Sequence, residues 1–507
     1  MIRRSCLVVA VTVAFVASSG LSQTIIIDTL ETTLGDTNDI VWLQLSEDYD
    51  STVATPLLFG WHGWGGDHTQ MSTMTAFDEQ ANERNWLAAS MRGPNIMHWN
   101  NPAAQSHCVD VLNWIAERYN FDHRRIYMLG GSMGGAAGMV FSNNHLDPSG
   151  WMAAATASGS GIMDCHRRYL EQGSNHSMYA AFGGTPVQVP FQYHRNSAIY
   201  FHDSTQSMHY NLRHLPMYYT FGLAETYWMQ HALDMYAVMS HIADTLYMVE
   251  AFWPSHGWDS MSAREICDWL ENFELNDNPD DISINADEDG RYYWVDVDQW
   301  DSTDAFTRFD ATHNSAQNSI IFHGWWNLEW AMLDLDMMGI DVDSIVHIEW
   351  TVDDTLETLR LPGYDMIPEQ VLRNGNPTSD WSYEAFWGIV SLFSDTGYSE
   401  WEIHPHSAFV PPNDPMLPIP AGDIIRAAWP NPFNPILRVN YHVEASGFVK
   451  VGVYDLLGRS TVTLSEGRHA AGDYRTAFDG RDFPSGIYFV CLESRTGTHS
   501  VKVVLLK

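Results

Sequence analysis

The sequence predicts an α/β domain built on a mainly parallel sheet, followed by an accessory β-domain and a small C-terminal β-sandwich. Apolar strand-like runs alternate with helical patterns in residues 56–273, and this alternation is typical of a parallel sheet with helical crossovers. Strand-like runs continue without helices in residues 291–405, and short alternating strands with turn signals fill residues 426–507. Because 507 residues are too many for one core, several domains are expected.

The expected strands of the first domain are short continuous apolar runs, which is the pattern of strands buried on both faces of a sheet. In chain order these runs are residues 56–63, 86–93, 125–132, 151–160, 217–222 and 246–253. Helical periodicity is found in residues 106–119, 227–242 and 262–273. We therefore assign residues 23–276 to an α/β domain. The alternation stops in residues 161–214, which are predicted to be an insertion that covers the active edge of the sheet as a lid.

The first 22 residues have the pattern of an export signal. Arg3 and Arg4 precede the apolar run Leu7–Ala17, which is too short to span a bilayer as a mature helix, and small residues follow it. Cleavage is expected near Ser22. Since no later run is long enough to cross a membrane, the mature chain is expected outside the cytoplasm without membrane insertion.

Four cysteines remain after the predicted cleavage, and their spacing fits no zinc pattern. They are Cys108, Cys165, Cys267 and Cys491. Disulfides persist in exported proteins, so one bridge between two of the first three is one interpretation. Buried free thiols are the other, and the sequence does not separate the two.

The chain is strongly acidic, with a formal net charge of −37 at pH 7. Residues 421–507 hold ten of the 26 Lys and Arg but only eight of the 63 Asp and Glu, so the acidity lies in the preceding part. Such a body repels nucleic acid and other polyanions, and a neutral polymer or a small ester is a better partner. A saline habitat is an alternative explanation for the acidic surface.

The α/β domain is followed by residues 277–290, an acidic and turn-rich segment that we expect to be a linker. Asn285, Asp287, Asp289 and Asp296 have the spacing of ligands in an EF-hand calcium loop. The match is incomplete, because Asn stands at the first position and Asp replaces the bidentate Glu at the last. A solvated linker is therefore the favoured interpretation, and no other metal or cofactor is expected.

Residues 291–405 are predicted to be an accessory β-domain of unassigned role. Its tryptophans suit either stacking on sugar rings or core packing, and core packing is the commoner use. A proline-rich linker, residues 406–425, separates this domain from the C-terminal sandwich.

The C-terminal segment, residues 426–507, carries motifs that identify it. These are "WPNPFNP" (Trp429–Pro435), "VYDLLGR" (Val453–Arg459), "FDGRDFPSGIYFV" (Phe478–Val490) and the closing "KVVLLK". In this order they resemble the sorting domain of proteins exported by the type IX (Por) secretion system, an Ig-like domain similar to that of flagellar hook-capping proteins. The resemblance implies contact with the secretion machinery and delivery to the cell surface or the medium.

The stretch "IYMLGGSMGG" suggests a nucleophile. Ser132 lies at the centre of Gly130–Gly134, a G-x-S-x-G pattern between a predicted strand and a small-residue helical run. A strand that turns at once into a helix, with one exposed side chain at the bend, needs neighbours without Cβ atoms. Ser132 is therefore the candidate nucleophile of a serine hydrolase.

An upstream loop is placed to bind an oxyanion. His62–Gly66, "HGWGG", directly follows a buried strand, from which a loop aims backbone N–H groups at the site. We assign one donor to the Trp64 N–H, with Gly63 as the next candidate, and the other to the Met133 N–H. A glycine turn held by a structural histidine is the alternative.

The acid and the base are expected downstream of the nucleophile, in the order Ser, acid, His. Glu225 lies on the loop after the run 217–222, and His256 lies on the loop after the run 246–253. Asp234, inside a predicted helix, and Asp244, at the wrong end of a strand, are weaker candidates for the acid.

The motifs "HGWGGD", "FDHRRIYMLGGSMGG", "GLAE" and "SHGW" occur in this order in the α/β domain. Together they resemble the secreted esterases of the α/β-hydrolase fold, a group that contains feruloyl esterases, acetylxylan esterases and polyhydroxybutyrate depolymerases. The resemblance implies Ser132 as nucleophile, Glu225 as acid and His256 as base. Glu225 departs from the Asp that is usual in this group.

The sequence therefore predicts an exported serine carboxylic-ester hydrolase that acts on an acetyl, feruloyl or polyester bond. The aromatic part of the insertion, Tyr169–Tyr219, is expected to decide which. Two alternatives remain: a serine peptidase of the prolyl-oligopeptidase type, and a non-catalytic surface protein that binds a polymer.

Overall fold

The computed structural model describes most of the chain between Gln23 and Leu506. The described residues are 23–35, 38–172, 176–251, 256–301, 304–353, 357–385, 387–406, 424–429, 431, 433, 435–445, 447–456, 458–481, 483–494 and 497–506. The predicted export signal and most of the predicted proline-rich linker lie outside these residues.

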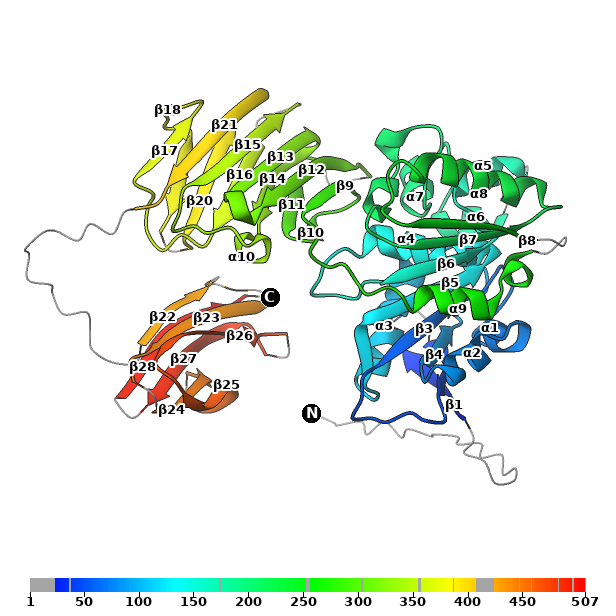
Figure 1. Ribbon diagram of the computed structural model, residues 1–507, viewed down its shortest axis with the longest axis horizontal. Helices are drawn as coiled ribbons and strands as arrows, with labels where there is room; N and C mark the ends of the chain where they lie inside the picture. The colour runs from blue at the N-terminus through cyan, green and yellow to red at the C-terminus, as the bar shows by residue number, and fades with distance from the viewer. Residues whose placement is uncertain are drawn as a thin grey trace, which may run out of the picture. The chain divides into compact units, whose positions relative to one another are not determined.

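The N-terminal domain is built on an eight-stranded sheet (Figure 1). Its strands are β1 (Thr24–Glu31), β2 (Asn38–Leu45), β3 (Thr55–Trp61), β4 (Leu87–Met91), β5 (Phe121–Gly131), β6 (Ala155–Gly159), β7 (Met217–Gly222) and β8 (Leu246–Ala251). Their order is β1-β2-β4-β3-β5-β6-β7-β8, and β2 runs antiparallel to the other seven strands, which are parallel to one another. The domain has the α/β-hydrolase fold.

Helices cover both faces of this sheet. One core packs against α3 (Pro102–Ala116), α4 (Ala137–Asn144) and α8 (Thr226–Met239). The opposite core contains residues of α1 (Gln70–Met74), α2 (Phe77–Glu83) and α9 (Ala263–Leu270). The α9 sequence "AREICDWL" explains why this helix packs against the sheet. Ile266, Cys267 and Leu270 fall on one face of the helix and are buried there.

Each strand and helix expected in residues 56–273 is found, whereas the N-terminal hairpin is an addition. β1 and β2 pair antiparallel at the edge of the sheet. β1 has polar and exposed positions on both sides, with Ile25 and Ile27 more than half exposed. The apolar run of β1, Ile25–Ile27, is shorter and more exposed than the runs by which the inner strands are recognised.

The expected insertion lies between β6 and β7. It contains α5 (Cys165–Glu171), α6 (His176–Phe182) and α7 (Pro190–Arg195), and then the short 3₁₀ helices η2 (Ser204–Gln206) and η3 (His209–Leu212). A separate apolar cluster, which includes Met178, Phe182 and Tyr193, packs this insertion against Trp99 and Met133 of the sheet edge. The insertion therefore has its own small core next to Ser132.

The accessory domain consists of two β-sheets, and its first strand corrects one sequence prediction. Residues 277–290 are not a linker throughout, because β9 (Asp281–Ala286) is an edge strand that pairs with β12 (Thr307–Asn314). Ile282 and Ile284 alternate inward along β9 and are buried. Because the segment is rich in acidic residues, the alternation of inward and outward side chains along β9 was not recognised in the sequence.

The remaining strands of the accessory domain are short and mostly antiparallel. They are β10 (Gly290–Tyr292), β11 (Val295–Gln299), β13 (Ser319–Trp326), β14 (Leu328–Leu333), β15 (Val346–Val352), β16 (Glu357–Pro362), β17 (Gln370–Arg373), β18 (Asn376–Pro377), β19 (Trp381–Glu384), β20 (Ile389–Ser394) and β21 (Gly397–His404), with η5 (Ser315–Gln317) and α10 (Leu335–Met338) between them. The two sheets have the orders β10-β11-β14-β16-β20-β19 and β18-β17-β21-β15-β13-β12-β9.

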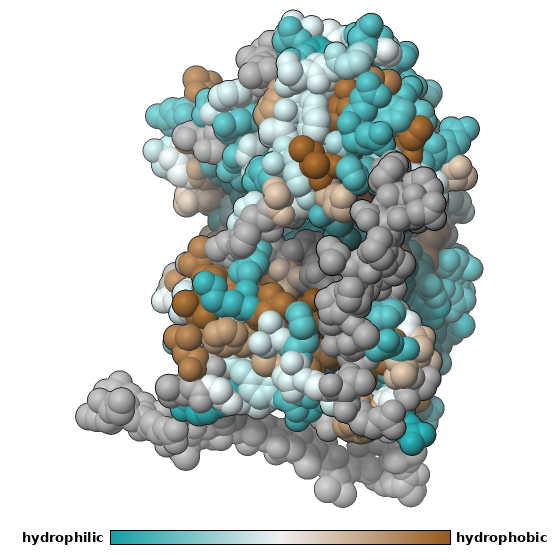
Figure 2. All heavy atoms as spheres, turned by 90° about the vertical axis from the view of Figure 1, so that its left-hand side faces the viewer, coloured by the Kyte–Doolittle hydropathy of each residue, from teal (hydrophilic) through white to brown (hydrophobic). Residues whose placement is uncertain are grey.

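Tryptophans of the accessory domain divide between core and surface. Trp294, Trp350 and Trp401 are fully buried, as the core interpretation predicts, whereas Trp300 and Trp325 are exposed. The upper part of the face shown in Figure 2 is mostly hydrophilic. The acidic composition of the chain is consistent with this surface.

The four side chains with calcium-loop spacing are engaged with other parts of the protein. Each has a different protein partner. The amide of Asn285 donates to the carbonyls of Thr205 and Ser207, Asp287 pairs with Arg195, Asp289 accepts from the Gln299 N–H, and Asp296 lies 3.9 Å from Arg291. Among the residues that the structure describes, no group of three or more His, Cys, Asp or Glu has an arrangement that could hold a metal ion.

The C-terminal domain is a β-sandwich of two small sheets. Its strands are β22 (Ile424–Trp429), β23 (Ile436–Val443), β24 (Gly447–Asp455), β25 (Ser460–His469), β26 (Gly472–Asp479), β27 (Gly486–Ser494) and β28 (Gly497–Leu505). β22 begins inside the predicted linker 406–425. The sheets have the orders β22-β23-β26 and β25-β24-β27-β28 and enclose one apolar core.

The four cysteines of the described chain are free thiols, and three of them are buried. None of the described helices is long and apolar enough to span a bilayer.

Candidate active site

Ser132 lies at a sharp bend between β5 and a helix. The strand ends at Gly131, Ser132 has a φ of +58°, and η1 (Ser132–Ala136) leads directly into α4. Residues other than glycine rarely adopt this left-handed backbone conformation, so the surrounding structure must enforce it. The bend leaves Ser132 half-buried at the carboxyl end of the central strand.

The glycines around Ser132 are required by close backbone contacts. A Cβ atom on Gly134 would lie 2.2 Å from the carbonyl oxygen of Trp61, and one on Gly131 would lie 2.6 Å from the backbone nitrogen of Trp258. A Cβ on Gly130 would meet the Gly134 carbonyl oxygen at 2.3 Å. The bend therefore packs directly against β3 and against the loop that follows His256.

The structure brings the three predicted catalytic side chains together. His256 Nε2 lies 2.8 Å from Ser132 Oγ, and His256 Nδ1 is hydrogen-bonded to Glu225 Oε1. Glu225 stands at the N-terminus of α8, just after β7, and His256 immediately precedes η4 (Gly257–Ser260). Three different loops at the carboxyl ends of β5, β7 and β8 supply the set.

Glu225 is buried and is held by hydrogen bonds as well as by His256. Its second carboxylate oxygen, Oε2, accepts from Ser160 Oγ at 2.5 Å and from the Gly222 N–H at 2.8 Å. A buried carboxylate with these donors is fixed in position and keeps one oxygen for the imidazole. Ser160 is a supporting residue that the sequence did not indicate, because only the fold brings the end of β6 next to Glu225.

The two weaker acid candidates lie elsewhere. Asp234 is paired with Arg167, and Asp244 with His214. Neither contacts His256.

The candidate donors of the oxyanion loop differ in their hydrogen-bond partners. The Trp64 N–H has no hydrogen-bond partner among the described residues, and Met133 directly follows the nucleophile. Gly63, however, donates its N–H to Gln70 Oε1 at 2.5 Å, so this group is engaged within the protein. Because the loop turns the Gly63 peptide toward α1, Gly63 is not an oxyanion donor in this arrangement.

Gln70 connects the oxyanion loop to the loop of the base. Its Oε1 accepts from the Gly63 N–H and, at 3.0 Å, from the indole Nε1 of Trp258. Trp258 lies two residues after His256. One amide oxygen therefore joins the two loops that flank Ser132. Nothing in the sequence indicated this, since the partners come from three separate segments.

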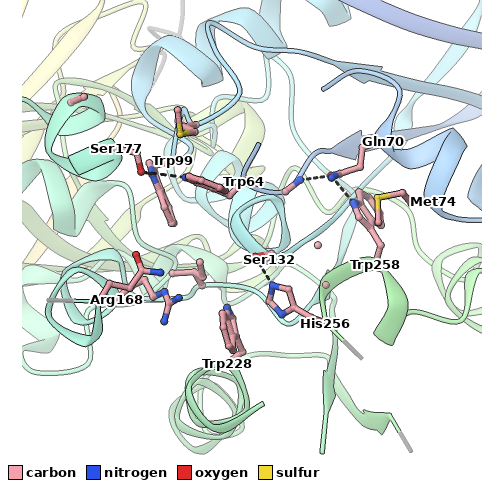
Figure 3. A pocket seen from close by; sticks show the side chains of 17 residues that line it. Trp64, Gln70, Met74, Trp99, Ser132, Arg168, Ser177, Trp228, His256 and Trp258 are labelled. Atoms are coloured by element: carbon pink, nitrogen blue, oxygen red, sulfur yellow. Dashed lines mark hydrogen bonds between the residues drawn. The ribbon is translucent and has the colours of Figure 1, made fainter. Parts of the chain in front are cut away.

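A cavity of about 1030 Å³ opens beside the triad (Figure 3). Four tryptophans, two methionines and one isoleucine supply most of its apolar lining. They are Trp64, Trp99, Trp228, Trp258, Met74, Met97 and Ile162. Polar lining comes from Ser132, His256, Gln70, Arg168, Gln172 and Ser177. The cavity is therefore largely lined by aromatic side chains, and Ser132 lies on its wall.

The insertion forms part of this cavity, as a lid would. Ser177 on α6 accepts hydrogen bonds from the indole N–H groups of Trp64, at 3.3 Å, and Trp99, at 2.9 Å. These contacts fasten α6 to the oxyanion loop. Arg168, Gln172 and Ala180 of the same insertion also line the cavity.

The sorting motifs seen in the sequence fall in residues 427–506, which match the family model described as the secretion system C-terminal sorting domain. The C-terminal sandwich is a sorting domain. It indicates type IX secretion, to the cell surface or the medium. No curated protein matches the sequence.

Several solved structures are similar to about half of the chain. A ferulic acid esterase is 13% identical and covers 50% of this chain and 97% of its own, with a TM-score of 0.39. The S-formylglutathione hydrolase of Staphylococcus aureus is 18% identical and covers 49% and 99%, with a TM-score of 0.38. An acetyl xylan esterase from Paenibacillus sp. R4 is 15% identical and covers 51% and 87%, with a TM-score of 0.37.

Proposed function

We propose that the protein is an exported serine hydrolase of carboxylic esters. The observation that carries this proposal is the continuous set of hydrogen bonds from Ser132 through His256 to Glu225. A serine hydroxyl is a weak nucleophile unless an oriented base accepts its proton. The sorting domain is consistent with a substrate outside the cell.

The geometry supports a two-step mechanism through an acyl-enzyme. Ser132 Oγ attacks the ester carbonyl while His256 Nε2 takes its proton, and Glu225 holds the imidazole in the required tautomer and stabilises its charged form. The N–H groups of Trp64 and Met133 would receive the oxyanion. His256 then protonates the leaving alcohol, and water hydrolyses the acyl-enzyme by the same route.

The lining of the cavity favours esters over peptides. A peptidase of the prolyl-oligopeptidase type normally needs an acidic pair or another anchor for a peptide amino terminus. No Asp or Glu lines the described cavity, whose one fixed charge is the cation Arg168. The aromatic walls suit a planar or apolar acyl group, such as feruloyl or a polyester unit, better than acetyl.

The test is hydrolysis of 4-nitrophenyl acetate by the mature chain and by its Ser132→Ala variant. The proposal expects turnover in the first and only background release in the second. Equal rates from the two folded proteins would contradict it and would favour a non-catalytic binding role.

A further inference from the structure

One wall of the cavity presents nitrogen donors close to the triad. Arg168, on α5 of the insertion, has its guanidinium carbon 4.7 Å from the centre of the Trp228 ring, on the first turn of α8. The Arg168 side chain is only 8% exposed. Both residues line the same cavity as Ser132.

The indole N–H of Trp228 points to a ligand that accepts a hydrogen bond. Its Nε1 atom is buried and has no hydrogen-bond partner in the described protein. An indole N–H is a donor only, and a buried donor without an acceptor costs free energy. In Figure 3 the nitrogen-bearing edge of Trp228 faces the cavity between Arg168 and His256. A bound molecule that places an oxygen there would satisfy this donor.

The donor pair lies within reach of a molecule whose ester is at Ser132. The Trp228 ring centre lies 4.5 Å from the ring centre of His256, whose Nε2 contacts Ser132 Oγ. Trp228 therefore stands between the reacting imidazole and the guanidinium of Arg168. A short substrate can occupy both the ester position and this donor pair.

The chemistry of the pair selects a carboxylate. Guanidinium and indole nitrogens donate but do not accept, and guanidinium binds carboxylates with particular strength. Glu171 already contacts Arg168 at 3.4 Å, but it also contacts Arg167 at 3.0 Å and His231 at 3.4 Å. The Glu171 carboxylate is therefore shared among Arg168, Arg167 and His231.

We propose that Arg168 and Trp228 form a carboxylate-binding subsite, and that the preferred substrates are half-esters of dicarboxylic acids. The inference rests on the proposed function, because it concerns substrate choice at the same site. The acidic body of the protein repels anions in general. A preference for an anionic ester must therefore come from a local contact such as this one.

The test compares two esters with acyl chains of the same length, 4-nitrophenyl hydrogen glutarate and 4-nitrophenyl pentanoate. Assays at high salt suppress the general repulsion, and the rate with Ser132→Ala corrects for spontaneous hydrolysis. We expect wild type to prefer the glutarate in kcat/KM. Arg168→Gln should lower that preference by about tenfold to hundredfold, the range for hydrogen bonds to a charged group.

Two further variants make the test specific. Trp228→Phe removes the N–H and keeps most of the ring, so the preference should fall by about threefold to tenfold. Arg213→Gln is the control, because this arginine pairs with Asp281 and does not line the described cavity, and it should leave the preference unchanged.

The outcomes separate this inference from the proposed function. A wild type that hydrolyses both esters without preferring the glutarate, or a preference that survives in both Arg168→Gln and Trp228→Phe, would overturn the subsite. If Arg168→Gln does not fold, the Trp228→Phe result decides. Rates no higher than those of Ser132→Ala for both esters would overturn the proposed function and the subsite with it.

Discussion

Replacing Gln70 by leucine should lower kcat with little effect on KM. The substitution removes the acceptor of two hydrogen bonds, from the Gly63 N–H at 2.5 Å and the Trp258 indole at 3.0 Å. Each donor left without a partner costs about 1–3 kcal/mol. Movement of the loop relieves this cost but displaces the neighbouring Trp64 N–H, and loss of one oxyanion donor costs about 2.7–4 kcal/mol of transition-state stabilisation. We therefore expect kcat to fall by about tenfold to several hundredfold.

The assay is steady-state hydrolysis of 4-nitrophenyl acetate, with the melting temperature measured to show that each variant folds. Gln70→Glu is the matched control, because it keeps an acceptor oxygen at the same reach and should retain much more activity than Gln70→Leu. A folded Gln70→Leu protein with wild-type kcat would refute the idea that Gln70 positions the oxyanion loop. A rise in KM alone would refute it as well.

Three further predictions concern folding and stability. Gly134→Ala should prevent a soluble, active fold because its Cβ would lie 2.2 Å from a backbone oxygen, whereas Gly150→Ala, whose Cβ has no neighbour closer than 3.5 Å, should express and turn over normally. Burial and the nearby charge of Arg308 lower the pKa of His209 to about 4, while the unfolded chain binds that proton below about pH 6.5. The unfolded state therefore binds more protons between these values, and stability should fall as the pH is lowered through them, with a smaller fall in His209→Gln on thermal melting. Asn211→Ala should lower the free energy of unfolding in urea by about 1–3 kcal/mol, because the backbone N–H of Asn285 in β9 loses its acceptor at 2.8 Å. An unchanged midpoint of unfolding would contradict this.

Much of the candidate site could be predicted because chain order and strand ends restrict where a triad can form. The carboxyl ends of parallel strands meet at one edge of the sheet. Glycines around Ser132 indicated the bend, and the loops after β7 and β8 contained Glu225 and His256 at the expected places in the order. The structure adds the distances and shows that the three side chains contact one another.

What could not be predicted depends on contacts between distant segments. Gln70, Ser160 and Trp228 carry no motif, and each gains its place from hydrogen bonds or ring contacts that only the folded chain creates. The assignment of Gly63 as a donor failed for the same reason, since the acceptor of its N–H comes from α1. The acidic composition of residues 277–290 also led to a wrong prediction. The segment was expected to be a linker, although Ile282 and Ile284 alternate inward along a strand.

The central claim is that Ser132 is an activated nucleophile, and covalent labelling tests it most directly. The mature protein would be treated with a fluorophosphonate, digested and examined by mass spectrometry. We predict one adduct on the peptide that contains Ser132, with none in Ser132→Ala and sharply slower labelling in His256→Ala. An unlabelled Ser132 in a folded protein that still hydrolyses 4-nitrophenyl acetate would contradict the account.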